Sequence, residues 1–231
     1  MATERGQWEK RISELIVESK QHQTTYFEKI GNFGIYIHPT VYSPKYFPET
    51  LWYAEHLPPI VGGKSFLEVG VGSGLISVSV AASGSAVSGV DINPHAVETT
   101  KQNFEANGQS GTIVVSDVFD NVSGRFDFIF WNHPWQNDAR IPEELKSEKT
   151  FDSGYRLLRR FIAQAQDHLT EEGAVLLGTS YYADLETMKG IYEENGYAHE
   201  CICQGQRSIG KDVTEEYYII QLRKQKTPHS S

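Results

Sequence analysis

Acidic side chains follow the ends of three successive predicted strands, where they could hold parts of one nucleotide-like ligand. Glu68 lies at a glycine-rich turn, Asp91 lies 23 residues later, and Asp117 closes a third apolar stretch. A carboxylate about 20 residues beyond such a turn can accept hydrogen bonds from both hydroxyls of a ribose, although Asp91 could also simply cap the next helix. Asp117 can accept from the exocyclic amine of adenine, with the Val118 amide available to a ring nitrogen. The three acids predict a site for an adenosine that carries a cationic amino-acid arm, with Ile92 among its contacts.

The glycine-rich turn defines how closely that ligand can approach the backbone. Gly70, Gly72 and Gly74 alternate after the apolar run 66–69 and precede a second apolar run. Glycine lets a chain turn sharply after a buried strand and removes the side chains that would collide with a ligand. The spacing differs from the G-x-G-x-x-G dinucleotide pattern, and no Gly-Lys-Ser or Gly-Lys-Thr follows, so a phosphate-cradling loop is excluded. An acid at this turn favours a ligand whose head is cationic or neutral.

The elements that must position these residues alternate between strand and helix from residue 62 onward. Continuous apolar strands separated by helices predict a parallel sheet covered on both faces, and the last two strands, joined without a helix, predict one reversed strand. We therefore expect an α/β fold with a Rossmann-like, seven-stranded, mostly parallel sheet. The predicted strands are 65–69, 86–91, 112–115, 126–131, 174–179, 197–203 and 216–223, and the predicted helices are 75–82, 94–107, 155–169 and 184–194.

The N-terminal part differs in composition from the rest of the chain. Residues 7–20 carry apolar side chains at helical spacing, and residues 26–59 are rich in aromatic residues and proline, with a short hairpin expected at 33–37 and a helix from about residue 48. We divide the chain into residues 1–60, a helix with an aromatic segment that covers substrate and cofactor; residues 61–224, the catalytic domain; and residues 225–231, a disordered tail.

Composition excludes several classes of protein. The formal net charge of −9 disfavours binding to a phosphate backbone, so nucleic acid is an unlikely partner and a small-molecule substrate is favoured. No apolar run reaches the length of a membrane span, and the polar N-terminus lacks a signal peptide, which makes the cytoplasm the default. Cys201 and Cys203 lack the partners of a zinc site, so no metal is expected. The sequence gives no information on oligomeric state.

The three acids and the glycine turn resemble the cofactor motifs of class I S-adenosylmethionine-dependent methyltransferases, over roughly residues 62–223. Asn132, His133, Pro134 and Trp135, which end an apolar strand, are similar to the Asn-Pro-Pro-Tyr signature of methyltransferases that act on planar nitrogens. The resemblance implies S-adenosyl-L-methionine as cofactor, bound in part by Asn132. It also implies that the Asn132 side chain and the His133 carbonyl accept from an NH₂ group while Trp135 stacks on the acceptor.

The signature departs from that pattern at two positions. His133 replaces a proline, and it could act as a general base near neutral pH or could serve only in packing. Pro134 still favours an extended backbone at His133. Trp135 replaces a tyrosine and offers a broader face, suited to a cation or another acceptor. We predict Asn132, His133 and Trp135 as catalytic residues, and Tyr42, Pro134, Trp135 and Tyr181 as substrate-binding residues.

Segment 37–51, together with residues 151–158 after the Asn132 motif, extends the resemblance to the release-factor glutamine methyltransferases, from about residue 35 onward. The family's arginine in this segment is absent, Lys45 being the nearest cation, and the N-terminal part is short. We therefore expect methyl transfer to a nitrogen of a small metabolite or amino-acid-like acceptor. One alternative is a cyclase that converts the cofactor into azetidine-2-carboxylate and methylthioadenosine. Protein glutamine methylation and a non-catalytic binding module are further alternatives.

Overall fold

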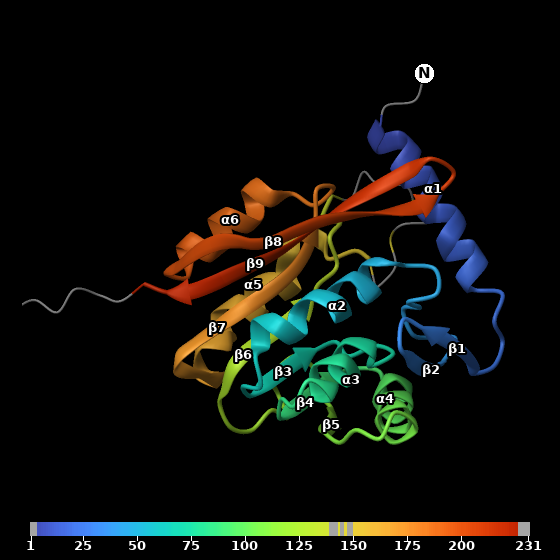
Figure 1. Cartoon of the computed structure of the whole chain (residues 1–231). Helices are drawn as coiled ribbons and strands as arrows, with labels where there is room; N and C mark the ends of the chain where they lie inside the picture. Colours follow the sequence, from blue (N-terminus) through green and yellow to red (C-terminus); the bar gives the residue numbers. More distant parts are fainter. Residues whose placement is uncertain (1–3, 139–142, 144–145, 147–149, 226–231) are drawn as a thin grey trace, which may run out of the picture.

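A seven-stranded sheet of order β5-β4-β3-β6-β7-β9-β8 forms the centre of the computed structural model (Figure 1), which describes residues 4–138, 143, 146 and 150–225. The strands β3 to β7 are parallel, whereas β9 is antiparallel to both of its neighbours. This confirms the predicted mostly parallel sheet with one reversed strand. The strands are β3 (Phe66–Val69), β4 (Val87–Asp91), β5 (Thr112–Val115), β6 (Phe126–Asn132), β7 (Leu169–Ser180), β8 (Tyr197–Gly210) and β9 (Val213–Lys224).

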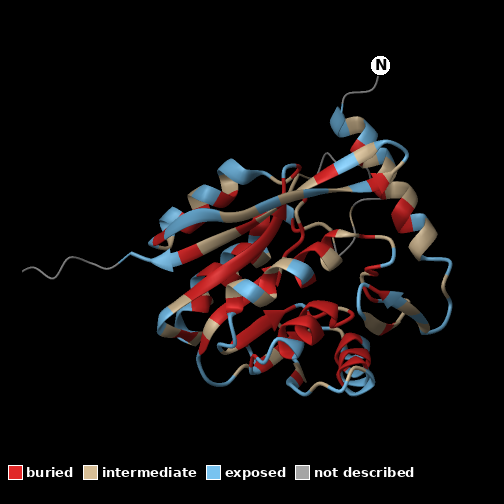
Figure 2. Cartoon of the chain, viewed as in Figure 1, coloured by how far each residue is buried: buried red, intermediate tan, exposed pale blue. Residues whose placement is uncertain are grey.

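Helices cover both faces of the sheet, as the buried character of its strands requires. Alternate strand residues point to opposite faces: Phe66 packs in the cluster formed with α2, α3 and α4, and Leu67 packs in the cluster formed with α5 and α6. Figure 2 shows the central strands and α3 buried, while α6 and much of the β8–β9 ribbon are partly exposed. The helices are α1 (Glu4–Ser19), α2 (Glu49–Val61), α3 (Leu75–Ala82), α4 (Pro94–Ala106), α5 (Arg156–Ala165) and α6 (Leu185–Glu194).

The N-terminal extension consists of α1 and a separate two-stranded antiparallel sheet. The sheet pairs β1 (Tyr26–Ile30) with β2 (Phe33–Ile37), so the hairpin is longer than the 33–37 expected from sequence. The strand β1 escaped prediction because it lies at the surface and only Ile30 is buried. The side chain of Asn103 on α4 accepts from the Tyr36 amide at 2.8 Å and thereby fixes the hairpin to the main sheet's helices.

The two C-terminal strands are much longer than predicted. Their outer parts form a ribbon closed by Lys211 and Asp212, both with positive φ, as a two-residue type I′ loop requires. Most of β8 is exposed or half-buried, so its sequence carries no continuous apolar run to mark its extent. This ribbon carries the sheet outward to α1: the Arg11 guanidinium donates to the Ile209 carbonyl at 2.8 Å.

The predicted division at residue 60 falls at the end of α2, whose Trp52 and Leu57 belong to the core of the main sheet. That division remains a prediction. Of the tail predicted at 225–231, all but Gln225 lies outside the described residues. Within the described part of the chain, no helix is long and apolar enough to cross a membrane.

Candidate active site

The carboxyl ends of β3, β4 and β6 open into a cavity of about 570 Å³ that brings together most of the predicted site. Its lining includes the predicted cofactor-binding residues Glu68, Gly70, Gly72, Asp91, Ile92, Asp117, Val118 and Asn132. The predicted acceptor-side residues Tyr42, His133, Pro134 and Trp135 line the same cavity. Two predicted residues, Gly74 and Tyr181, are not part of this lining.

The glycine turn after β3 is built from residues in the left-handed region, where φ is +70° at Gly70, +54° at Gly72 and +75° at Gly74. Only glycine adopts such angles without strain. Gly70 and Gly72 face the cavity, whereas a Cβ at Gly74 would lie 2.6 Å from the Thr100 side chain of α4. Gly74 therefore permits close packing of α3 on α4, and its predicted contact with the cofactor is indirect.

Glu68 is 3% exposed, although its carboxyl faces the cavity. The Ser77 hydroxyl donates to it from the first turn of α3. Burial raises the pKa of Glu68 to about 8, which keeps the side chain largely protonated at neutral pH. A cationic ligand in the cavity would favour the ionised form, so the residue fits the ammonium group of an amino-acid arm.

Asp91 ends β4 with its carboxylate fixed by the backbone. Its two oxygens accept from the amides of Gly72 and Asn93, each at 2.9 Å. A carboxylate has further lone pairs, so this anchored group can still accept from a ribose diol. Ile92 beside it is 66% exposed and lines the cavity, where it can cover an adenine ring. The structure shows these backbone anchors, and the ribose-binding role of Asp91 stays a prediction.

Asp117 forms an ion pair with a basic side chain of a neighbouring helix. Arg160 of α5 donates to both carboxylate oxygens, once at 3.0 Å, and lowers the pKa of Asp117. The acid is therefore ionised, but Arg160 occupies part of its accepting capacity. Val118 has φ +51°, a strained angle for a branched residue, and its side chain is buried. Val118 lines the cavity, and contact of its amide with an adenine ring nitrogen stays a prediction.

Asn132, the last residue of β6, meets Trp135 directly. The Trp135 indole donates to the Asn132 side-chain oxygen at 3.2 Å and to the Gly178 carbonyl at 3.3 Å. The Tyr155 hydroxyl donates to the Trp135 carbonyl at 2.7 Å and so holds the backbone of the segment. The Asn132 oxygen and the Trp135 ring are thus brought together as predicted. The indole N–H occupies one of the two acceptor positions of that oxygen.

His133 is 2% exposed and packs edge-to-face against Trp131 and Tyr155. Its Nδ1 lies 2.8 Å from the Pro134 carbonyl, so Nδ1 carries the proton and donates. Nε2 is buried without a hydrogen-bond partner among the described residues. Burial lowers the pKa of His133 to about 4, which argues against a general base tuned to neutral pH. The neutral ring instead offers Nε2 as a hydrogen-bond acceptor.

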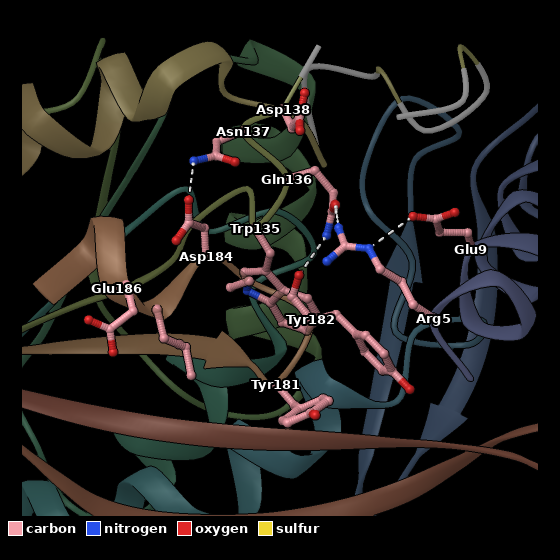
Figure 3. Close-up of a pocket in the computed structure, with 12 residues that line it drawn as sticks. Arg5, Glu9, Trp135, Gln136, Asn137, Asp138, Tyr181, Tyr182, Asp184 and Glu186 are labelled. Carbon is pink, nitrogen blue, oxygen red and sulfur yellow. Dashed lines mark hydrogen bonds and ion pairs between the residues drawn. The ribbon is translucent and has the colours of Figure 1, made fainter. Parts of the chain in front are cut away.

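A second hollow, of about 550 Å³, lies on the outer side of Trp135 and Gln136, which line both spaces. Figure 3 shows Arg5 reaching between Glu9 and Gln136, to which it donates at 3.1 Å each. Tyr181, predicted to bind substrate, is 57% exposed and lines this outer hollow. Because Tyr181 does not line the inner cavity, its role in substrate binding stays a prediction.

The N-terminal segments contribute more side chains to the inner cavity than Tyr42, the one that the sequence singled out. Trp8 and Glu49 both line it, and Trp8 stacks on Tyr182 with ring centroids 4.5 Å apart. Tyr42 stacks on Phe47 at 4.0 Å. The apolar stripe of α1 did predict that the helix docks, but nothing in the pattern showed where.

The Rossmann-like sheet and the strand-tip acids define a class I S-adenosylmethionine-dependent methyltransferase. The chain belongs to the methyltransferase small domain family, whose model matches residues 32–198. A putative protein N5-glutamine methyltransferase of Methanocaldococcus jannaschii is 35% identical over 171 residues, which are 71% of this chain and 84% of that protein. The family confirms methyl transfer and S-adenosyl-L-methionine as cofactor.

Two further relatives match smaller shares of their own length. The release factor glutamine methyltransferase of Haemophilus influenzae is 29% identical over 56% of this chain and 50% of that protein. The ribosomal RNA small subunit methyltransferase C of Chromohalobacter salexigens is 36% identical over 51% of this chain and 36% of that protein. Among solved structures, the Thermus thermophilus 16S rRNA N2 G1207 methyltransferase, in complex with AdoMet and guanosine, shares the fold with a TM-score of 0.61 and 21% identity. The match covers 87% of this chain and 50% of the Thermus thermophilus chain.

These relatives contradict the predicted partners. We expected a small-molecule substrate and considered nucleic acid unlikely, whereas the relatives are named for protein glutamine or ribosomal RNA. The prediction was wrong because net charge describes the whole surface, while the acceptor is chosen by a few groups at one cavity. The comparisons likewise give no support to a small-metabolite acceptor or to the cyclase.

Proposed function

We propose that the chain methylates the side-chain amide nitrogen of a glutamine residue in a protein. The main observation in support of this acceptor is the position of the Asn132 side chain at the end of β6, in the inner cavity and beside the Trp135 ring. The 35% identity to a protein named for N5-glutamine methylation supports the same acceptor. The planar NH₂ of a glutamine offers two donors, which suit two fixed acceptors and one flat aromatic wall.

The chain's own residues orient the amide. The Asn132 side-chain oxygen and the His133 carbonyl accept from its two N–H groups, so that the nitrogen lone pair faces the cofactor. S-adenosylmethionine supplies an electrophilic methyl group. Transfer would form an N–C bond while the bond between the methyl carbon and the sulfur breaks, leaving S-adenosylhomocysteine, and the amide nitrogen would lose one proton to water. Since His133 has a pKa of about 4, it is too weak a base to drive this step at neutral pH, and positioning carries most of the rate.

The two hollows separate the reacting group from the rest of an acceptor protein. The inner cavity holds cofactor and amide, while the outer hollow is lined by polar groups such as Arg5, Asp184 and Glu186. Trp135 and Gln136 line both, so a side chain that passes Trp135 leaves its backbone in the outer hollow. Tyr181 would then contact residues next to the glutamine. This arrangement suits a polypeptide better than a free metabolite.

Transfer of a tritiated methyl group to separate acceptors tests the proposal. The full chain is incubated with labelled S-adenosylmethionine and either a recombinant release factor or small-subunit ribosomal RNA, and each acceptor is then counted. We expect label in the release factor and its loss when the modified glutamine is replaced by asparagine. Label in the RNA alone would overturn the proposal and assign the RNA relatives' type of acceptor instead.

A further inference from the structure

Two buried carboxyl groups, Glu49 and Glu215, form an acidic pair that the proposed mechanism does not use. Glu49 begins α2, Glu215 lies on β9, and each is only 1% exposed. Burial and mutual repulsion raise the pKa of Glu49 to about 8, and burial raises that of Glu215 to about 7. The pair therefore holds protons near neutral pH in the absence of a cation.

The acidic pair is only partly satisfied by the protein. Glu215 accepts from the indole N–H of Trp8, whereas one oxygen of Glu49 is buried without a hydrogen-bond partner among the described residues. The groups that face the pair are neutral or acidic: Trp8 on α1, Tyr42 on the segment before α2, Tyr53 on α2 and Tyr217 on β9. Within the described residues, no Lys or Arg shifts the pKa of either carboxyl. Burying a carboxyl oxygen without a hydrogen-bond donor is costly, so a ligand that brings a donor to Glu49 would lower that cost.

The unpartnered oxygen belongs to a residue that lines the inner cavity, and Trp8, Tyr42 and Trp135 line the same space. The Trp135 ring lies 6.1 Å from that of Tyr217, whose pKa both carboxyls raise. This places the acidic pair near Trp135, on the predicted acceptor side of the cavity. Aromatic rings around a carboxylate form a site for an organic cation, since both attract positive charge.

The shape of the site distinguishes it from simple packing. A buried pair with a purely structural role would be fully hydrogen-bonded inside the core, as Asp152 is by the amides of Leu157 and Leu158. Glu49 instead lines the cavity and keeps one buried carboxyl oxygen that accepts no hydrogen bond within the described residues. Arg5, a cation of α1, is already engaged by Glu9 and Gln136 and does not neutralise the pair.

We propose that Glu49, supported by Glu215, binds a cationic side chain of the acceptor, a guanidinium or ammonium group carried next to the methylated residue. This inference rests on the proposed function, because that function makes the bound cation part of an acceptor protein. The cation site itself can be tested without methyl transfer. A basic residue near the target glutamine would then be a specificity determinant. The bound cation would displace the proton that the acidic pair holds.

Calorimetry of the full chain saturated with S-adenosylhomocysteine provides the test. The probes are N-acetyl-arginine methylamide and its neutral isostere N-acetyl-citrulline methylamide. We expect the arginine probe to bind at least about tenfold more tightly, with proton release near neutral pH and with affinity that rises as the pair ionises. The substitution Glu49→Gln should remove the preference, whereas Glu55→Gln, on the exposed side of the same helix, should retain it.

Each contrary result has a separate meaning. Equal binding of the two probes to the unmodified chain would overturn the cation site, whatever the variants do. A preference that survives in both Glu49→Gln and Glu215→Gln, with S-adenosylhomocysteine affinity intact, would also overturn it. If the arginine probe bound only in the absence of S-adenosylhomocysteine, the acidic pair would belong to the cofactor site. That result would also overturn the proposed cation site for the acceptor. A cation preference in a chain that labels RNA but not protein would instead defeat the proposed function and leave the cation site standing.

Discussion

The two ends of the inner cavity are built in different ways. At the cofactor end, Glu68, Gly72 and Asp91 lie within 24 residues of one another and follow adjacent strands. At the acceptor end, Trp8, Glu49 and Trp135 come from α1, α2 and the segment after β6. The cofactor end is therefore local in sequence, and the acceptor end exists only after the chain has folded.

The polar groups of the two ends also differ in how they are satisfied. Asp91 is anchored by two backbone amides, and Glu68 accepts from Ser77. His133 and Glu49, both ionisable, each retain a buried atom without a partner in the described structure, whereas at the cofactor end the Ser73 hydroxyl, which does not ionise, also lacks one. Preformed anchors suit a ligand that every reaction shares, while unsatisfied groups suit an acceptor that brings its own donors. Substitutions at one end that leave the other end unchanged test whether the two ends act separately.

The largest effect is expected from Asn132→Ala at the acceptor end. Without the side-chain oxygen the amide is no longer oriented, so the transfer rate should fall by on the order of a hundredfold or more. S-adenosylhomocysteine affinity should stay within about threefold, since the main anchors lie on β3 and β4. Single-turnover transfer and calorimetry on the same preparation measure both. An equal fall in affinity and rate would show that Asn132 acts mainly on the cofactor.

The converse effect is expected from Asp91→Ala at the cofactor end. The variant loses the ribose contact and frees the Gly72 amide, which should weaken S-adenosylhomocysteine binding about thirtyfold to a hundredfold. The control Asp120→Ala removes an exposed acid after β5 and should bind as the unmodified chain does. Calorimetry measures both variants. Unchanged affinity of Asp91→Ala would remove the ribose assignment.

Two glycines with similar backbone angles separate packing from strain. Gly74→Ala adds a Cβ 2.6 Å from Thr100 at φ +75°, whereas Gly108→Ala adds one in open space at φ +64°. We expect the first to lower the free energy of unfolding by about 2–4 kcal/mol and the second by about 1 kcal/mol. Urea unfolding measures the difference. Equal losses would mean that the contact between α3 and α4 relaxes without cost.

The smallest effect concerns pH. Glu68 has a pKa of about 8 in the folded chain and an ordinary, lower pKa in the unfolded chain, so the folded state binds the proton more tightly. Its stabilising contribution is present below the unfolded pKa and is lost as pH rises through about 8. Glu68→Gln should therefore reduce the fall in stability between about pH 6 and pH 9 by roughly 1 kcal/mol, while the exposed Glu105→Gln should not. Urea unfolding of the ligand-free chain at several pH values decides whether this holds.

The difference between the two ends also explains what the sequence could predict. The sheet, its reversed strand and the strand-tip positions of Glu68 and Asp91 follow from apolar runs and turn chemistry, and the structure contains them. Asp117 was placed correctly, but its partner Arg160 lies 43 residues away and local pattern cannot reveal such a pairing. The same limit hid Glu49, because one acid at the start of a helix has an ordinary local explanation as a favourable dipole contact.

Burial changed two expectations that rested on residue type. His133 was a possible base near neutral pH because an unperturbed histidine titrates there, yet its burial lowers the pKa to about 4. Cys201 lies within the predicted strand 197–203 and yet is exposed, because β8 is an edge strand with a register shift between Cys201 and Cys203. Neither degree of burial can be derived from neighbouring residues alone.

The position of the transferred methyl group tests the central proposal most directly. The full chain is incubated with S-adenosylmethionine and a release factor, and the protein is digested and analysed by tandem mass spectrometry. We predict a mass increment of one methyl substitution on the side-chain amide of a glutamine, with S-adenosylhomocysteine as the coproduct. A methyl group on any other atom, or methylthioadenosine formed without an acceptor, would contradict the proposed role of Asn132 and Trp135.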